Sequence, residues 1–200
     1  MVDDEMRARL IDAARRDRDM RARLAASGAL FGGYHPEMEA VHVANAELLE
    51  EIIDVIGGWP TRKRFGDDGA GAAFAIAQHA ISQPAFQRRA LERLLEAAEH
   101  GEINPLDTAY LADRIAVFEG RAQMFGTQFD WDERGHLSPA AVADPGNLDE
   151  RRANIGLPPI AEAIASMRAS AAAEGETPPA DIEQRRVDFD AWARRVGWRA

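Results

Sequence analysis

Residues 36–60 read PEMEAVHVANAELLEEIIDVIGGWP and carry the strongest secondary-structure signal in the chain. At 100° per residue, the apolar side chains fall on one arc of a helix and most of the carboxylates on the opposite arc. The apolar arc contains Val41, Leu48, Leu49, Ile52, Ile53, Val55 and Ile56. This pattern predicts an amphipathic helix that begins at about residue 35 or 36 and ends at the two glycines before Trp59.

The helical period extends beyond this segment. Residues 70–77 contain only Ala, Gly, Phe and Ile, which is typical of a buried helix, and we expect a central helix over residues 70–81. Asn104 and Pro105 form a favourable helix start, because Asn caps unpaired amide groups and Pro suits the first helical position. No strand–helix alternation occurs. The sequence therefore predicts an all-α fold, a compact helical domain of about five core helices between residues 6 and 118.

Three regions follow from the composition along the chain. We expect an N-terminal helix and connector over residues 1–34, a core domain with the candidate site over residues 35–160, and C-terminal helices over residues 161–200. Residues 121–147 are irregular and predict a long loop with at most a short hairpin, and loops of this length are often functional. Residues 172–179, AAEGETPP, read as a linker before the last helix.

Charge and composition exclude several classes of protein. Lys plus Arg is 24 and Asp plus Glu is 34, a net charge of −10, whereas nucleic-acid-binding proteins normally carry a basic excess. The absence of Cys excludes thiolate metal sites and Cys nucleophiles. No apolar run approaches the ~20 residues of a membrane helix, and the first residues, MVDDE, lack the apolar segment of a signal peptide. We expect a cytoplasmic protein that binds neither nucleic acid nor membranes.

Polar side chains stand on three predicted helices where the helical period favours apolar ones. They are His42, Asn45, Gln78, His79, Asp113 and Arg114. A buried polar group without a hydrogen bond costs about 1–3 kcal/mol, and a buried charge costs more. The economical explanation is that these side chains face one another and line one pocket. Each of them alone is also compatible with a structural network between helices or, for Asp113 and Arg114, with an ion pair.

The irregular region contributes a fourth group of polar residues. Gln123, Thr127 and Gln128 supply neutral hydrogen-bond donors and acceptors, and Gly126 allows tight backbone geometry or close approach of a ligand. These side chains either complete the predicted pocket or tie the loop to the helices.

Taken in order, these motifs resemble a family of uncharacterised bacterial proteins, a domain of unknown function. The motifs are His42-x-x-Asn45, Gly58-Trp59-Pro60-Thr61, Gln78-His79, Asp113-Arg114, Gln123 and Gly126-Thr127-Gln128. The resemblance covers roughly residues 38–159. The family pattern has tyrosine before the GTQ motif, where this chain has Phe125. The resemblance implies a shared site at these positions and implies no activity.

The chemistry that these residues support best is acid–base catalysis. Histidine is the side chain best suited to acid–base chemistry at physiological pH, and we expect the Asp113 carboxylate to orient the ring of His79, so that the pair gives and takes protons. Arg114 is expected to bind an anionic group of a small polar substrate. Hydrolysis and elimination both fit, and no cofactor is expected. The expected substrate-binding residues are His42, Asn45, Trp59, Gln78, Arg114, Gln123, Thr127 and Gln128.

Two other classes of function stay open at this point. His42, His79 and Asp113 supply two imidazoles and one carboxylate, which would suit an open Zn or Fe site, although they lie on separate helices and form no HExxH pair. The same pocket in a non-catalytic protein would bind a small ligand or a partner. A homodimer through the terminal helices is a further possibility, since Phe189 and Trp192 share one face of the last helix.

Overall fold

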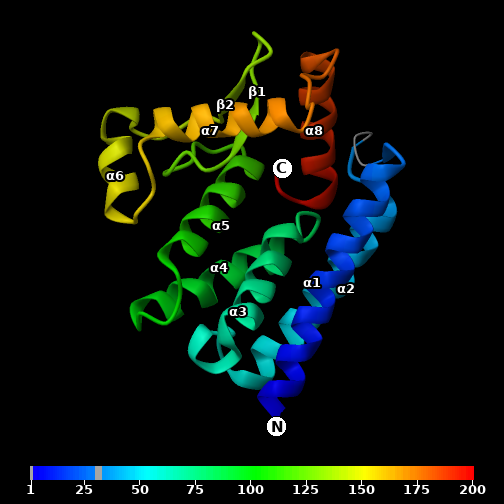
Figure 1. Cartoon of the computed structure of the whole chain (residues 1–200), viewed down its shortest axis with the longest axis vertical. Coiled ribbons are helices and arrows are strands. Elements are labelled where there is room, and N and C mark those ends of the chain that lie inside the picture. Colours follow the sequence, from blue (N-terminus) through cyan, green and yellow to red (C-terminus); the bar gives the residue numbers. More distant parts are fainter. Residues whose placement is uncertain (1, 30–32) are drawn as a thin grey trace. The chain divides into compact units, whose positions relative to one another are not determined.

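A computed structural model describes residues 2–29 and 33–200 of the chain, and α-helices dominate it (Figure 1). Residues 30–32, part of the expected connector, lie outside the described residues. The chain divides into two compact units, residues 1–107 and 108–200. The dominance of helices confirms the predicted all-α class. The predicted domain boundaries near residues 34 and 160 stay predictions.

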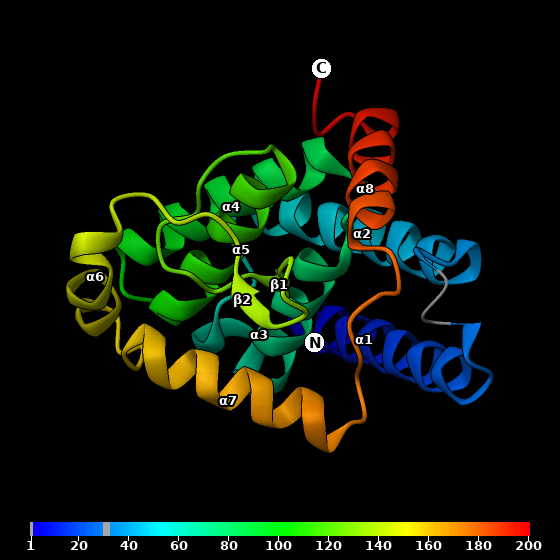
Figure 2. The ribbon, with the colours of Figure 1, turned by 90° about the horizontal axis from the view of Figure 1, so that it is seen from above.

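Among its described residues, the first unit contains four long helices: α1 (Val2–Ala26), α2 (Pro36–Ile56), α3 (Arg62–His79) and α4 (Pro84–Glu99). α1 packs against both α2 and α3, and α3 also contacts α2 and α4 (Figure 2). α2 has the bounds expected from its sequence. At the start of α2 the His35 ring accepts a hydrogen bond from the Glu37 amide. Gly57 ends the helix in the left-handed conformation at φ 72°.

Small residues bring α1 and α3 close together. A Cβ atom on Gly69 of α3 would lie 2.9 Å from the Arg7 side chain of α1, so only glycine fits this position without a shift. The core of the unit is formed by fully buried apolar side chains, among them Leu10, Leu49, Ile52, Phe65, Ile76 and Leu94. This close approach positions the end of α3 beside the middle of α1.

The central helix differs at both ends from the predicted span of residues 70–81. A first helical turn already forms at Arg62, and Gly66 then breaks the helix with φ 68° and ψ 173°. Glycine is the residue that adopts this conformation at low cost, so the break falls where the sequence allows it. α3 ends at His79 because Ala80 departs from helical geometry and α4 begins at Pro84.

The second unit contains most of α5 (Pro105–Phe118), a short hairpin, and three further α-helices. Strands β1 (Phe129–Trp131) and β2 (Leu137–Pro139) pair antiparallel, with Trp131 opposite Leu137. This hairpin lies within residues 121–147, where the sequence allowed one. The 3-10 turn Pro145–Asn147 leads into α6 (Leu148–Asn154), which is followed by α7 (Ile160–Ala173) and α8 (Ile182–Val196).

The last helix, α8, packs against the end of α5 through contacts between aromatic rings. The Phe118 ring centroid lies 5.9 Å from Phe189, 5.7 Å from Trp192 and 5.2 Å from Trp198. Arg199 donates hydrogen bonds to the carbonyls of Phe118 and Val117. The apolar face of α8 is thus used inside the chain, and dimerisation through it stays a prediction. None of the described helices has both the length and the apolar character needed to cross a membrane.

Candidate functional site

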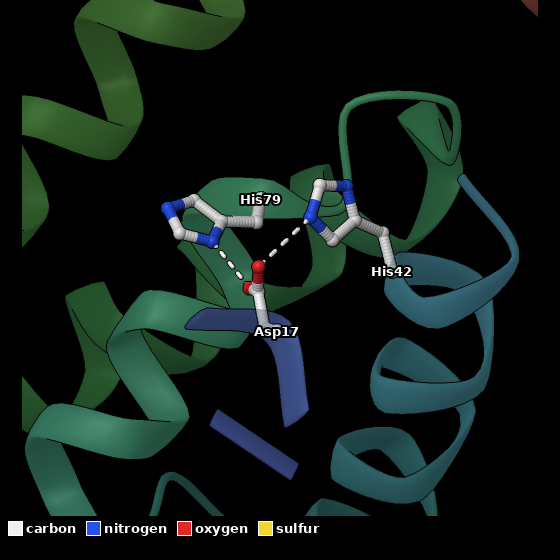
Figure 3. A group of neighbouring side chains, drawn as sticks. All are labelled: Asp17, His42 and His79. Atoms are coloured by element: carbon white, nitrogen blue, oxygen red, sulfur yellow. Dashed lines mark hydrogen bonds and ion pairs between the residues drawn. The ribbon is translucent and has the colours of Figure 1, made fainter. Parts of the chain in front are cut away.

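The first unit buries a carboxylate between two imidazoles. Asp17 lies on α1 with 3% of its surface exposed, and its two oxygens face different histidines (Figure 3). Oδ1 lies 3.3 Å from Nε2 of His42 on α2, and Oδ2 lies 2.5 Å from Nδ1 of His79 at the end of α3. Three helices therefore converge on one titratable cluster, which we call the Asp17 cluster: Asp17, His42 and His79.

The two histidines differ in their access to solvent. The His42 side chain is 10% exposed, whereas the His79 side chain is 41% exposed. The second ring nitrogen of His79, Nε2, points away from the carboxylate (Figure 3). His79 is thus held at one nitrogen by a buried partner, while its side chain as a whole is partly exposed.

Asp17 stays ionised despite its burial. Burial by itself raises the pKa of this carboxyl, but hydrogen bonds from His42 and His79 outweigh that effect and hold the pKa well below its ordinary value. An ionised carboxylate only accepts hydrogen bonds, so the ring nitrogens that face Asp17 carry the hydrogens. A neutral His79 therefore has its hydrogen on Nδ1 and an unprotonated Nε2.

Tyr34 orients the second imidazole. Its Oη lies 2.8 Å from Nδ1 of His42, and the two rings stack with centroids 5.7 Å apart. Burial raises the pKa of the Tyr34 phenol above its ordinary value of 10.0, so the hydroxyl remains protonated at neutral pH. A neutral His42 donates from Nε2 to Asp17 and accepts at Nδ1 from this hydroxyl.

Three other residues that the sequence assigned to a pocket are buried in the first unit. Asn45 is buried and donates to the carbonyl of Ala13, which ties α2 to α1. Gln78 is buried at the end of α3, and its backbone carbonyl accepts from Gln87 Nε2. Trp59 is buried as well, at 5% exposure.

Asp113 has a different role from the one predicted for it. It lies on α5 with 1% exposure, and its oxygens accept the backbone amides of Met124, Phe125 and Thr127 and the hydroxyl of Thr127, at 2.7–3.1 Å. The carboxylate at His79 is Asp17, so the expected His79–Asp113 pair is corrected to His79–Asp17. Asp113 anchors the loop that follows α5.

The remaining loop residues complete this anchor. Gln123 is fully buried, donates to the carbonyls of Gln128 and Ala140, and accepts the Gln128 amide. Arg114 Nε donates to the side-chain oxygen of Gln128 at 3.2 Å, and Gln128 donates to Thr127. Burial lowers the pKa of Arg114 to about 10, which leaves it charged at neutral pH. These contacts match the structural alternative, in which the side chains tie the loop to the helices.

Two arginines that the sequence did not single out also hold the loop through hydrogen bonds. Arg152 is 2% exposed and donates to the carbonyls of Phe125 and Pro158. Arg151 donates to the carbonyls of Met124 and Ala143. The backbone amides of Met124, Phe125 and Thr127 therefore face a carboxylate, and the carbonyls of Met124 and Phe125 face two guanidiniums.

Comparison with known proteins places the chain in a family. Residues 6–174 match the family of unknown function DUF6624. The chain belongs to the DUF6624 family. No curated protein and no solved structure matches it. The resemblance drawn from the ordered motifs is thereby confirmed at the level of a family without known function.

The DUF6624 match includes Asp17, which sequence reasoning missed. The sequence does carry a signal for Asp17, because it lies seven residues after Leu10 and four after Ala13, which are both buried, and so shares their face of α1. It is thus a charged residue on the apolar face of α1, the same kind of exception that drew attention to His42. The many Arg and Asp residues of this helix obscure that face.

Two kinds of chemistry are open to the Asp17 cluster in this DUF6624 protein. His79 Nε2 can take up and release a proton, with Asp17 fixing the tautomer of the ring. Alternatively, one ligand atom from each of Asp17, His42 and His79 can bind a metal ion, since these atoms lie within 4.8 Å of one another.

Proposed function

We propose that this protein is an acid–base enzyme in which His79 transfers the proton and Asp17 orients His79. The observation that supports this proposal is the half-exposed imidazole of His79, bound through Nδ1 to a buried carboxylate at 2.5 Å. The substrate is a small polar molecule, and the reaction is a hydrolysis or an elimination.

The tautomer explains why the carboxylate matters. With its hydrogen held on Nδ1 by Asp17, neutral His79 has a lone pair on Nε2 that can accept a proton from water or from a substrate carbon. The imidazolium that forms is then stabilised by the adjacent negative charge of Asp17. In the reverse step the same nitrogen donates the proton to the leaving group.

Exposure supports a functional role over a purely structural one. A network that only bridges helices gains most when all its members are sealed from water, as Asp17 and His42 are. The His79 side chain is instead 41% exposed, although it makes the shortest contact of the cluster. This combination of a buried orienting group and an accessible base is the arrangement that proton transfer to a bound molecule requires.

The anionic character expected of the substrate is a separate part of the proposal. It depended on Arg114, whose observed side-chain partner is Gln128 in the second unit. The substrate class proposed here is therefore defined by acid–base chemistry, and an anionic group on the substrate stays a prediction.

The test combines a substrate panel with a matched pair of variants. Small esters, amides, glycosides and β-substituted acids are incubated with the wild-type chain, His79→Ala and His100→Ala. His100 is an exposed histidine of the same unit, so its removal leaves turnover unchanged. His79→Ala loses turnover while circular dichroism shows a folded chain. Full turnover by His79→Ala, or ligand binding without turnover, overturns the proposal.

A measurement on the chain alone tests the geometry without a substrate. Nitrogen-15 NMR distinguishes the two neutral tautomers of an imidazole, and we expect His79 with its hydrogen on Nδ1. In Asp17→Asn the preference for this tautomer is lost. A wild-type His79 with its hydrogen on Nε2 contradicts the role given to Asp17.

A further inference from the structure

The Asp17 cluster also has the composition of a metal site. It offers one carboxylate oxygen and two imidazole nitrogens, ligand types that bind Zn²⁺ in sites without thiolates. The three residues come from α1, α2 and α3, so helix packing sets the positions of the ligands before any ion arrives. Among the described residues, these three form the one group found to have this potential.

The spacing of the ligand atoms fits such an ion. Metal–ligand bonds of 2.0–2.1 Å in a tetrahedral site place the ligand atoms about 3.3 Å apart. Asp17 Oδ1 and His42 Nε2 are 3.3 Å apart, and each of the three residues offers a ligand atom that lies within 4.8 Å of the other two. His79 Nδ1 now lies 2.5 Å from the other carboxylate oxygen, Oδ2, and moves away from it to make room for the ion.

The surroundings of the cluster meet two further requirements of a metal site. A metal-bound imidazole usually has a partner at its other nitrogen, and His42 has the Tyr34 hydroxyl at 2.8 Å from Nδ1. An ion also needs a path of entry, which the exposed side of His79 supplies. The ionised Asp17 and the net charge of −10 both favour a cation.

We infer that Asp17 Oδ1, His42 Nε2 and His79 Nδ1 bind one Zn²⁺-like divalent ion, and that this ion excludes His79 from acid–base catalysis. Both ring nitrogens that face Asp17 carry hydrogens in the metal-free state. When the ion binds, the ring hydrogen of His42 moves from Nε2 to Nδ1, and the Nδ1–H group then donates to the Tyr34 hydroxyl. The ring hydrogen of His79 moves from Nδ1 to Nε2. A histidine that is neutral before the ion binds releases no proton in this step, and a histidine that is an imidazolium releases one.

The consequence for catalysis rests on the function proposed above. Once Nε2 of His79 carries the hydrogen, it has no lone pair with which to accept a proton. The metal-bound and proton-transferring states of the cluster are therefore mutually exclusive. Metal binding itself depends on the three ligands and on no assumption about the reaction.

Equilibrium dialysis of the full chain, without a histidine tag, against Zn²⁺ tests the site. We expect one Zn²⁺ per wild-type chain and binding at least a hundredfold weaker in His42→Gln, which removes a ligand and leaves the His79–Asp17 pair. Tyr34→Phe retains all three ligands and is expected to bind about tenfold more weakly, which provides a conservative variant if His42→Gln does not fold. His100→Gln, which removes an exposed histidine, is expected to bind as the wild type does.

Nitrogen-15 NMR with and without Zn²⁺ reports the second half of the inference. We expect the hydrogen of His79 to move from Nδ1 to Nε2 when Zn²⁺ is added. Absence of stoichiometric Zn²⁺ binding overturns the inference, and so does unchanged binding in both His42→Gln and Tyr34→Phe. These readouts need no substrate, so their failure leaves the acid–base proposal intact, and a failure of the turnover test leaves the binding result intact.

Discussion

Replacement of Asp113 by asparagine tests whether this residue anchors the loop after α5. The carboxylate is 1% exposed and accepts three backbone amides and one hydroxyl. In Asp113→Asn one oxygen remains as an acceptor, and an amide group that can only donate replaces the other. The Thr127 hydroxyl can turn to accept from this group, but the Thr127 amide cannot.

The expected cost follows from that inventory. One hydrogen bond to a charged group is lost, worth about 1.5–3 kcal/mol, and a poorly hydrated amide is left without a partner, which costs about 1–3 kcal/mol. Because such terms overlap, we expect a loss of roughly 3 kcal/mol in the free energy that holds the loop closed. This corresponds to about a hundredfold change in the opening equilibrium.

Amide hydrogen exchange measures this equilibrium at the residues concerned. We expect the amides of Met124, Phe125 and Thr127 to exchange about a hundredfold faster in Asp113→Asn. Thr127→Val keeps the backbone amide but removes the hydroxyl, which donates to Asp113 and accepts from Gln128, so it is expected to cost about 1 kcal/mol, or roughly fivefold. Glu133→Gln removes a charge from a side chain that is 84% exposed and is expected to change nothing.

A different outcome would return Asp113 to the catalytic role first predicted for it. If the three amides in Asp113→Asn exchange at the wild-type rate and the urea midpoint is unchanged, the carboxylate does not hold the loop. Loss of turnover in that same variant would then indicate direct participation in the reaction.

Three further expectations concern the second unit. Gly126→Ala is expected to lower the free energy of unfolding by about 2 kcal/mol, because φ is 65° at this position and the new Cβ would lie 3.0 Å from a side chain of α7. Urea denaturation measures this loss, and an unchanged midpoint contradicts the expectation. A hydrogen bond from the backbone amide of His136 contributes most to lowering the pKa of Asp132 below 3.8. The ionised Asp132 therefore stabilises the hairpin above pH 3.8, and this stabilisation is lost as the pH falls through the lowered pKa. Carboxyl NMR shifts check that direction, and a midpoint above 3.8 refutes it. Truncation after Ala171 uncovers the Phe118 ring, so thermal denaturation should show a lower melting temperature, whereas an unchanged one would show that the C-terminal helix is separable.

The helices of this protein could be predicted because their signals are local. The apolar period of residues 41–56 and the glycine at position 57 act within a few turns of one chain segment, and the structure has α2 where they indicate it. The start of α5 at Pro105 follows in the same way from the Asn104 cap, whose side chain accepts the Leu106 amide. The break at Gly66 was less predictable, because a glycine inside a helix is compatible with either a kink or a continuous helix.

The sequence by itself identified His42 and His79 as polar groups on apolar faces, and it could not say which carboxylate they would meet. Asp17 and Asp113 both lie on apolar helix faces, and the sequence distances from His79 are 62 and 34 residues. Only the packing of α1 against α3 brings Asp17 to His79, since a contact across 62 residues depends on how whole helices meet. The partners of Asp113 are backbone amides, which every residue except proline carries, so no side-chain pattern marks them.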